Sequence, residues 1–124
     1  MIAVDTSAFI LYFQNSKHPI AQKIESLLSA NSAVLPPVVL SELLSDPVLP
    51  DELRRYLSDL IVLDVLPDYW VRVGNMRQQL LAKKLKCKLP DAMIAQSCLD
   101  YDVALLTGDY DFRHYVAYFG LKVF

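Results

Sequence analysis

The chain has 124 residues and a net charge of −2; 54% of its residues are apolar and 21% are charged. This length suits one domain, and an apolar share above the usual value of about 45–50% excludes a disordered chain. The small negative charge excludes binding of nucleic acid through an overall positive charge, and no apolar stretch approaches the roughly 18–20 residues of a membrane-spanning helix.

Short apolar runs alternate with longer amphipathic segments along the whole chain. Runs without polar alternation are typical of strands covered on both faces of a sheet. We expect such strands at residues 1–4, 32–36, 61–66, 103–107 and 121–124. Apolar positions at helical spacing, several preceded by proline or a capping residue, predict helices. The expected helices cover residues 7–14, 19–31, 37–46, 50–60, 67–86, 89–102 and 113–119.

This alternation of strands and helices predicts an α/β fold. We expect a three-layer α/β/α sandwich with a mostly parallel sheet of about five strands, formed as a single domain by residues 1–124. The side chains expected on the core side of the long helix at 67–86 are Trp70, Val73, Met76, Leu80 and Leu81. The excess of apolar residues predicts that some apolar surface remains for a dimer or partner interface.

The first residues and the cysteines indicate the cellular setting. The segment MIAVDTSAF has no basic residue before its apolar positions, so we expect no signal peptide. Cys87 and Cys98 form no disulfide framework and have no second ligand at zinc spacing, which favours a reducing, cytoplasmic location. We expect Cys98 in the core and Cys87, between two lysines, in an exposed loop.

Acidic residues stand at the ends of several expected elements. Asp5 follows the first strand, and Asp109 and Asp111 follow the strand at 103–107. If these strands are parallel, the three acids lie at the same edge of the sheet, where ligands of such folds bind. Glu42 lies in the apolar helix PVVLSELLSD, and Asp91 opens the helix PDAMIAQSCL.

Each acid also has a simpler interpretation when it is taken alone. Asp5 could cap a helix, Asp91 could favour the first turn of a helix through the dipole, and Asp109 and Asp111 could form a turn. Glu42 could be an exposed residue of an amphipathic helix. Together, however, four acids from separate segments would repel one another if they were buried, and a divalent cation would resolve that conflict. Because the donors are all oxygen, with no nearby His or Cys, we expect Mg²⁺ or Mn²⁺ rather than zinc. Ions held in this way serve phosphate substrates and can activate water.

Positive charge is concentrated in one segment. Between Tyr69 and Pro90 there are six Lys and Arg residues and no acid, which is half of the twelve in the chain. The cations nearest to Asp91 in sequence, and therefore the preferred contacts for a phosphate backbone, are Lys83, Lys84, Lys86 and Lys88. The alternative is that they form an ordinary solvated helix face.

Four short stretches resemble the PIN-domain family, and within it the toxins of VapBC-type toxin–antitoxin pairs. They are VDTSAF at 4–9, LSELL at 40–44, LPDAMIAQ at 89–96 and LLTGDYDF at 105–112, in the order found in that family. The resemblance implies that Asp5, Glu42, Asp91 and Asp109 are the four metal-binding and catalytic acids. It also implies a supporting hydroxyl from Thr107 and a small polar residue, Thr6 or Ser7, after the first acid. Asp111 stands at a more variable position and is a further candidate ligand.

The resemblance implies a Mg²⁺- or Mn²⁺-dependent endoribonuclease that hydrolyses RNA phosphodiester bonds. It further implies a cognate antitoxin protein as partner and a homodimer, in keeping with the apolar excess. The main alternative is a catalytically silent PIN-like module that binds RNA or protein. A receiver-type phosphorylation domain is disfavoured because Asp5 is followed by Thr6 rather than by a second acid. A dehalogenase-like phosphohydrolase is disfavoured because the stretch DTS lacks the second Asp of a D-x-D motif.

Overall fold

The computed structural model describes residues 1–124 and contains a four-stranded parallel sheet in the order β3-β2-β1-β4. The strands are β1 (Ile2–Val4), β2 (Ala33–Leu35), β3 (Ile61–Val62) and β4 (Ala104–Leu106). In the register of the sheet, Ala3 of β1 lies opposite Val34 of β2 and Leu105 of β4. All strand pairs are parallel, so the carboxyl ends of β1 and β4 lie side by side at one edge.

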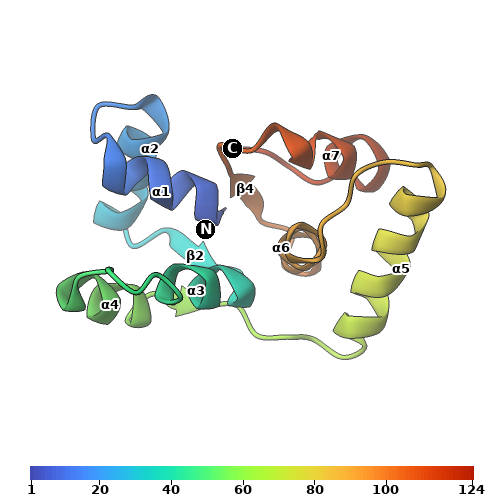
Figure 1. Cartoon of the computed structure of the whole chain (residues 1–124), viewed down its shortest axis with the longest axis horizontal. Helices are drawn as coiled ribbons and strands as arrows, with labels where there is room; N and C mark the ends of the chain where they lie inside the picture. The colour runs from blue at the N-terminus through green and yellow to red at the C-terminus, as the bar shows by residue number, and fades with distance from the viewer.

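Seven helices surround this sheet, which confirms the predicted α/β sandwich (Figure 1). They are α1 (Thr6–Gln14), α2 (Pro19–Ser29), α3 (Pro37–Leu44), α4 (Asp51–Ser58), α5 (Tyr69–Ala82), α6 (Leu89–Asp100) and α7 (Arg113–Phe119), and a 3₁₀ turn, η1 (Tyr110–Phe112), precedes α7. The helices form three groups in Figure 1. The α1–α2 pair lies at the upper left, the α3–α4 pair at the lower left, and α5 to α7 lie at the right. None of the seven helices is long and apolar enough to cross a membrane.

The central strands are buried on both faces. Val4 of β1, Leu35 of β2 and Leu105 of β4 have no exposed surface, as expected for strands without polar alternation. Ile61 is 56% exposed because β3 is an edge strand. The expected fifth strand at 121–124 is reduced to a single parallel bridge between Leu105 and Val123. Its two backbone hydrogen bonds, both made with Leu105, are too few to extend the ladder.

The long helix α5 is shorter and rotated relative to the prediction. Asp68 has a left-handed φ of 62°, so the helix begins at the next residue, Tyr69. Lys84 also has a left-handed φ, of 60°, and the helix ends before it, at Ala82. Tyr69 takes the buried place, and its hydroxyl donates to the carbonyl oxygen of Met93 at 2.7 Å. The assignment of Trp70 and Leu81 to the core is therefore wrong, since their side chains are 61% and 45% exposed.

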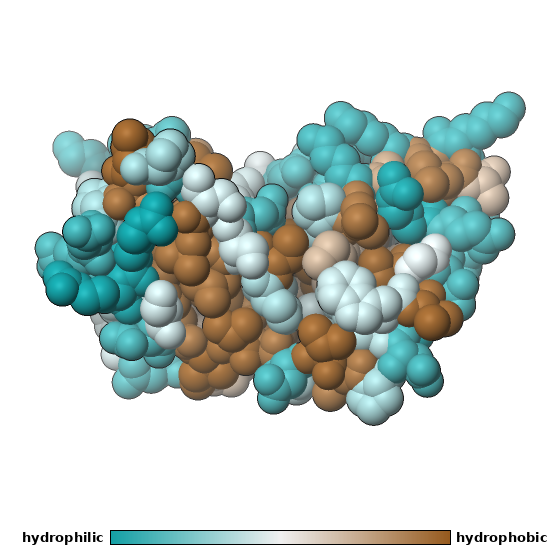
Figure 2. All heavy atoms as spheres, turned by 60° about the horizontal axis from the view of Figure 1, so that its bottom comes forward, coloured by the Kyte–Doolittle hydropathy of each residue, from teal (hydrophilic) through white to brown (hydrophobic).

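Apolar surface does remain outside the core. Figure 2 shows several patches of apolar residues on the face turned forward in that view. The most exposed large apolar side chains are those of Val48, Tyr110, Val71 and Trp70. This surface is available for the interface that the apolar excess predicts.

Cys87 is buried rather than exposed as the sequence predicts. Its side chain is 6% exposed and its Sγ lies 2.9 Å from the hydroxyl oxygen of Tyr115, which is itself in the core. Cys98 is buried as expected, and both thiols are free. The loop between the two lysines thus turns its cysteine inward while Lys86 and Lys88 stay in solvent.

Candidate active site

Asp5 leaves the sheet directly after β1 and is held against β4. Its backbone N–H donates to the carbonyl oxygen of Leu106 at 3.0 Å, which ties the carboxyl ends of the two strands together. The carboxyl group is buried, with 4% of the residue exposed. Although Asp5 precedes α1, its side chain makes no capping hydrogen bond to that helix. Its position is therefore not explained by helix capping, the simpler interpretation of its place in the sequence.

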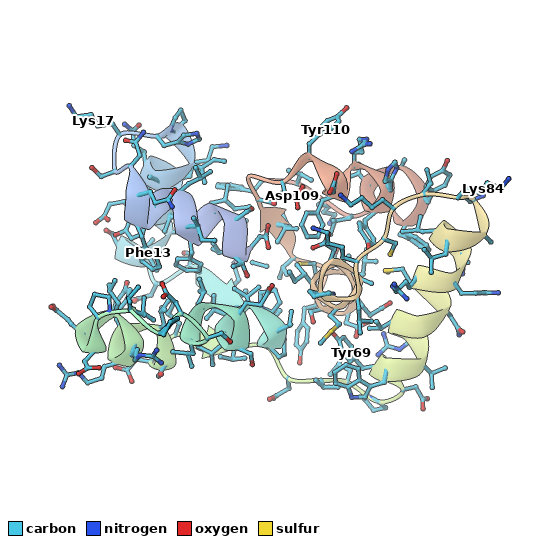
Figure 3. The ribbon with its side chains drawn as sticks, viewed as in Figure 1. Phe13, Lys17, Tyr69, Lys84, Asp109 and Tyr110 are labelled. Atoms are coloured by element: carbon cyan, nitrogen blue, oxygen red, sulfur yellow. The ribbon has the colours of Figure 1, made fainter.

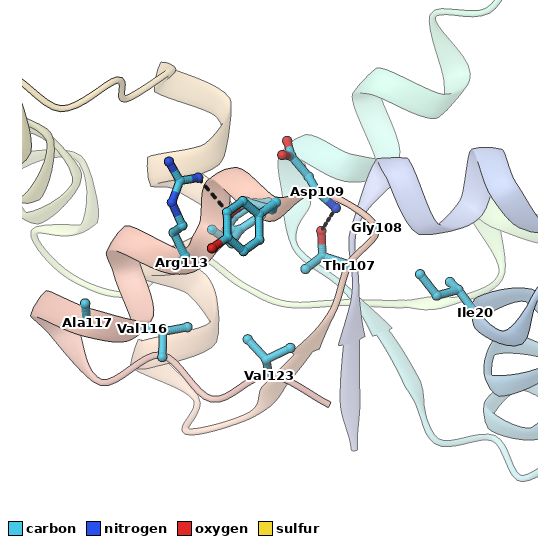
Figure 4. Close-up of a pocket in the computed structure, with 10 residues that line it drawn as sticks. Ile20, Thr107, Gly108, Asp109, Arg113, Val116, Ala117 and Val123 are labelled. Atoms are coloured by element: carbon cyan, nitrogen blue, oxygen red, sulfur yellow. Dashed lines mark hydrogen bonds between the residues drawn. The ribbon is translucent and has the colours of Figure 1, made fainter.

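Two hydroxyl groups orient the Asp5 carboxylate. Ser7 Oγ donates to Asp5 Oδ2 at 2.6 Å and Thr107 Oγ1 donates to the same oxygen at 2.7 Å. Each hydroxyl also accepts a hydrogen bond from the loop after β4. The backbone N–H of Gly108 donates to Ser7 Oγ at 3.0 Å. The backbone N–H of Asp109 donates to Thr107 Oγ1 at 2.9 Å (Figure 4). The two hydroxyls therefore fix the Asp5 carboxylate and the position of the loop at the same time.

Gly108 allows a close approach between the loop after β4 and α1. Its φ is not in the positive region, so no left-handed turn calls for glycine here. A Cβ at this position would lie 2.8 Å from Leu11 Cδ1 of α1. The missing side chain lets the loop approach α1 closely enough for the hydrogen bond to Ser7.

The acids after β4 meet the first turn of α6. Asp91 follows Pro90 in that turn, and oxygens of the Asp91, Asp109 and Asp111 carboxylates lie within 4.8 Å of one another. Asp109 Oδ1 accepts the backbone N–H of Asp111 at 2.8 Å, which bends the chain into η1 and brings Asp111 back toward the group. Asp111 is thus a member of the acidic cluster, a point on which the sequence pattern was undecided.

Burial and repulsion from neighbouring acids disfavour the charged forms of Asp5 and Asp91. Burial raises the pKa of Asp91 to about 6, the charges of Asp109 and Asp5 add to the increase, and Lys88 opposes it. The pKa of Asp5 is also raised, by burial above all, with a further contribution from Asp109, while the hydrogen bonds from Ser7 and Thr107 lower it. The four carboxylates together form a site with an excess of negative charge.

Glu42 lies at the margin of this cluster. Its side chain is exposed, and its Oε1 accepts a hydrogen bond from Thr6 Oγ1 at 2.8 Å. Thr6 is the neighbour of Asp5, so this bond connects Glu42 of α3 to the segment that carries the buried acid. Glu42 is not among the three acids whose carboxylate oxygens lie together, whereas Asp111 is.

The cations near the acids are partly those predicted. Lys86 Nζ lies 3.9 Å from Asp111 Oδ2, and Arg113 lies 3.5 Å from Asp111 Oδ1. Lys83 instead covers the ring of Tyr118, 5.0 Å from its centre, and Lys84 projects away from Asp109 at the far end of α5 (Figure 3). Sequence reasoning missed Arg113, because residues two apart do not normally face each other and the spacing from Asp111 gives no signal of this contact.

The donor set fits a hard divalent cation. It consists of carboxylate oxygens, supported by hydroxyl groups, with neither imidazole nor thiolate among the clustered groups. Such donors suit Mg²⁺ or Mn²⁺, which bind through a few carboxylates and keep part of their water shell. A cation between Asp91, Asp109 and Asp111, with Asp5 beside them, would offset the repulsion that burial makes costly.

Comparisons with known proteins agree with this geometry. The family model described as PIN domain matches residues 2–117. The chain belongs to the PIN domain family. This confirms the resemblance seen in the four sequence stretches. A comparison with curated proteins found no match.

Solved structures with the same fold as this PIN domain come from toxin–antitoxin systems. The structure of VapBC2 from Rickettsia felis bound to a DNA fragment of its promoter has a TM-score of 0.77 at 21% identity. The match covers 100% of this chain and 98% of that chain. DNA-bound VapBC from Salmonella typhimurium has a TM-score of 0.75 at 20% identity, with the same coverage of 100% and 98%. VapBC-5 from Mycobacterium tuberculosis has a TM-score of 0.68 at 16% identity, covering 98% and 95%. At these identities the likeness establishes the fold, and the similar lengths show that this PIN domain spans the matched chains almost entirely.

The raised pKa of Asp91 predicts how the metal-free PIN domain responds to pH. The pKa of Asp91 is about 6 in the folded state, above the ordinary 3.8 of an unfolded chain. Proton binding therefore stabilises the fold below pH 3.8, and this contribution is lost as pH rises from 3.8 to about 6. Asp91→Asn should therefore be more stable than wild type in EDTA above pH 6, by about 1–2 kcal/mol after allowance for solvent screening. Urea unfolding at pH 4.5 and 7.5 measures the difference in the free energy of unfolding between Asp91→Asn and wild type. This difference should be smaller at pH 4.5. A difference that grows on acidification contradicts the raised pKa of Asp91.

Proposed function

We propose that this PIN domain is a Mg²⁺- or Mn²⁺-dependent endoribonuclease and the toxin of a VapBC-type toxin–antitoxin pair. The observation that carries the proposal is the convergence of Asp91, Asp109 and Asp111 beside buried Asp5 at the carboxyl edge of the sheet. A solvated turn would not bury an acid or bring carboxylates from two elements together. Fold membership raises the expectation of nuclease activity, but the site is what supports it here.

The residues of the chain have distinct parts in the proposed reaction. Asp91, Asp109 and Asp111, whose carboxylate oxygens lie together, would hold the metal with buried Asp5 beside them, and Glu42 stands at the margin as a further acid. When bound, the metal would supply positive charge for the phosphate and lower the pKa of water to form a nucleophile. Ser7 and Thr107 orient the Asp5 carboxylate through their hydrogen bonds, which also oppose the increase in its pKa that burial causes. The expected reaction is hydrolysis at phosphorus with departure of the 3′ oxygen, which leaves 5′-phosphate and 3′-hydroxyl ends.

The RNA backbone needs cations to approach an acidic site. Lys86 and Arg113 already contact Asp111 at the rim, and Lys88 lies close enough to act on Asp91. We propose that these three side chains hold the phosphates on either side of the bond that is cleaved. This assigns the predicted RNA contacts mainly to Lys86 and Lys88, with Arg113 added.

The proposed partners are an antitoxin protein and a second copy of the chain. The related structures are described as VapBC complexes or toxin–antitoxin complexes, which supports an antitoxin partner. The exposed apolar surface, including Trp70 and Val71, could be covered in either assembly. The proposed location is the cytoplasm, in keeping with two free thiols.

A catalytically silent module is the alternative function. It would be expected to have lost or dispersed some of its acids, whereas Asp5, Asp91 and Asp109 are present and oriented by hydrogen bonds or by mutual proximity in this chain. The alternative predicts RNA or protein binding that does not depend on a metal.

Cleavage of a mixed RNA pool tests the proposal. Wild type is expected to cut RNA in Mg²⁺ or Mn²⁺ and to stop in EDTA, and the products should carry 5′-phosphate ends. Asp5→Asn should be inactive under all three conditions because it removes the buried charge at the centre of the site. Cleavage that persists in EDTA, or 2′,3′-cyclic phosphate ends, would refute a metal-dependent hydrolysis.

A further inference from the structure

A pocket of about 520 Å³ opens beside the acidic site, on the other side of the loop after β4 (Figure 4). Its walls come from the start of α2, from the loop and η1, from α7 and from the C-terminal segment. The apolar side chains that form them include Ile20, Val116 and Val123. A pocket of this size falls in the range of about 300–1,000 Å³ that is typical of small-molecule sites.

The pocket and the acidic site share one wall. Thr107, Gly108 and Asp109 line the pocket, and the same residues position Asp5 and contribute a clustered carboxylate. In Figure 4 the Asp109 carboxylate lies on the opposite side of the loop from Val116 and Val123. A ligand held by the acids through one group could therefore place its next group in the pocket.

The mouth of the pocket carries an exposed aromatic ring with a cation on it. Tyr110 is 78% exposed, and the Arg113 guanidinium lies 4.4 Å from the centre of its ring. Arg113 also donates to the carbonyl oxygen of Tyr110 at 3.2 Å and lies 3.5 Å from Asp111. One arginine thus connects the ring at the pocket to the acids of the site.

These features together select a ligand that is planar, apolar on its faces and attached to a phosphate. Bases stack on aromatic side chains and on arginine, and the cation attracts the phosphate that each base carries. An aliphatic side chain of a protein would use the apolar walls, but it would gain nothing from the exposed ring or from Arg113.

We propose that this pocket binds the nucleobase next to the phosphate that is cleaved, with Tyr110 as the stacking surface and Arg113 as the contact to its phosphate. The proposal rests on the function proposed above, because it places RNA at the acidic site. The pocket then sets the base preference of the cut. Its walls are apolar, so shape and stacking decide that preference more than hydrogen bonds do.

Binding of nucleotides can be measured without any cleavage. The probes are AMP, GMP, CMP and UMP, added in EDTA to protein with labelled Ile and Val methyl groups. The methyl signals of Ile20, Val116 and Val123 should shift in NMR spectra, and at least one nucleotide should bind more strongly than the others. Ala117→Phe, which fills the pocket from an exposed position, should weaken this binding about tenfold or more.

A matched pair of tyrosine variants tests the stacking surface. Tyr110→Ala should weaken nucleotide binding, whereas Tyr118→Ala should not, since Tyr118 is exposed on α7 but does not line the pocket. In RNA cleavage, Tyr110→Ala and Ala117→Phe should change which base stands beside the cut, while Tyr118→Ala should leave that pattern as in wild type.

The outcomes separate the two proposals. Nucleotide binding in the pocket with no RNA cleavage by wild type would refute the nuclease function and leave a nucleotide site. Metal-dependent cleavage with an unchanged base pattern in both pocket variants, and no methyl shifts at saturating nucleotide, would overturn the pocket proposal alone. Methyl shifts that occur only on addition of a partner protein would assign the pocket to protein docking and overturn it too.

Discussion

Asp91→Asn is expected to fold normally and to lose metal-dependent RNA cleavage by on the order of 10²–10³-fold or more. The neutral amide keeps the shape of the side chain but removes one of the clustered charges that would hold the metal. Because burial raises the pKa of Asp91 to about 6, the metal-free fold gains nothing from its charge at neutral pH. Loss of activity should therefore come without loss of structure.

Thermal unfolding with and without Mn²⁺ separates these effects. Wild type should be stabilised by Mn²⁺ at pH 7.5, and Asp91→Asn should show a much smaller increase while being at least as stable in EDTA. Asp102→Asn is a suitable control, since Asp102 is an exposed acid just beyond the end of the same helix, away from the cluster. Full activity of Asp91→Asn in Mn²⁺ would refute the metal-ligand assignment.

The double change Lys86→Glu and Lys88→Glu is expected to weaken RNA binding roughly 10- to 100-fold at low salt. Both side chains are exposed beside the acids, and reversal of their charge adds repulsion to an already negative site. The effect should shrink as salt is raised, because screening weakens the contribution of every exposed charge. Filter binding to an RNA oligonucleotide in Ca²⁺ or EDTA would measure affinity without cleavage.

The matched control is Lys17→Glu with Lys84→Glu. It changes the net charge by the same amount, but both side chains project from the molecule far from Asp109 (Figure 3). RNA affinity should fall much less in this control. If the two double variants lose affinity equally, the effect comes from overall charge, and Lys86 and Lys88 are not specific contacts.

The core of the site could be predicted because it depends on sheet topology. Asp5 and Asp109 each follow a strand, and parallel neighbours place such residues at one edge. Asp91 could be predicted from its place after Pro90 in the first turn of a helix. These positions follow from element boundaries, which short apolar runs and prolines mark clearly.

Features that depend on side-chain packing could not be predicted in the same way. Asp111 joins the cluster because the Asp109 side chain accepts its backbone N–H, a local bond that no spacing rule specifies. Trp70 lies outside the core because α5 begins after Asp68, whose left-handed conformation is not signalled by a glycine in the sequence. Arg113 and the pocket depend on how α7 and the C-terminal segment pack against the loop after β4.

The most direct test is the anomalous difference map of crystals soaked in Mn²⁺ at pH 7.5 or above, where Asp91 is charged. We predict a peak among the carboxylates of Asp91, Asp109 and Asp111, with Asp5 beside it and Glu42 farther out. The same soak of Asp91→Asn crystals should give a weaker peak or none. A map without a peak in this cluster at saturating Mn²⁺, or with its main peak at other acids, would contradict the proposed metal site.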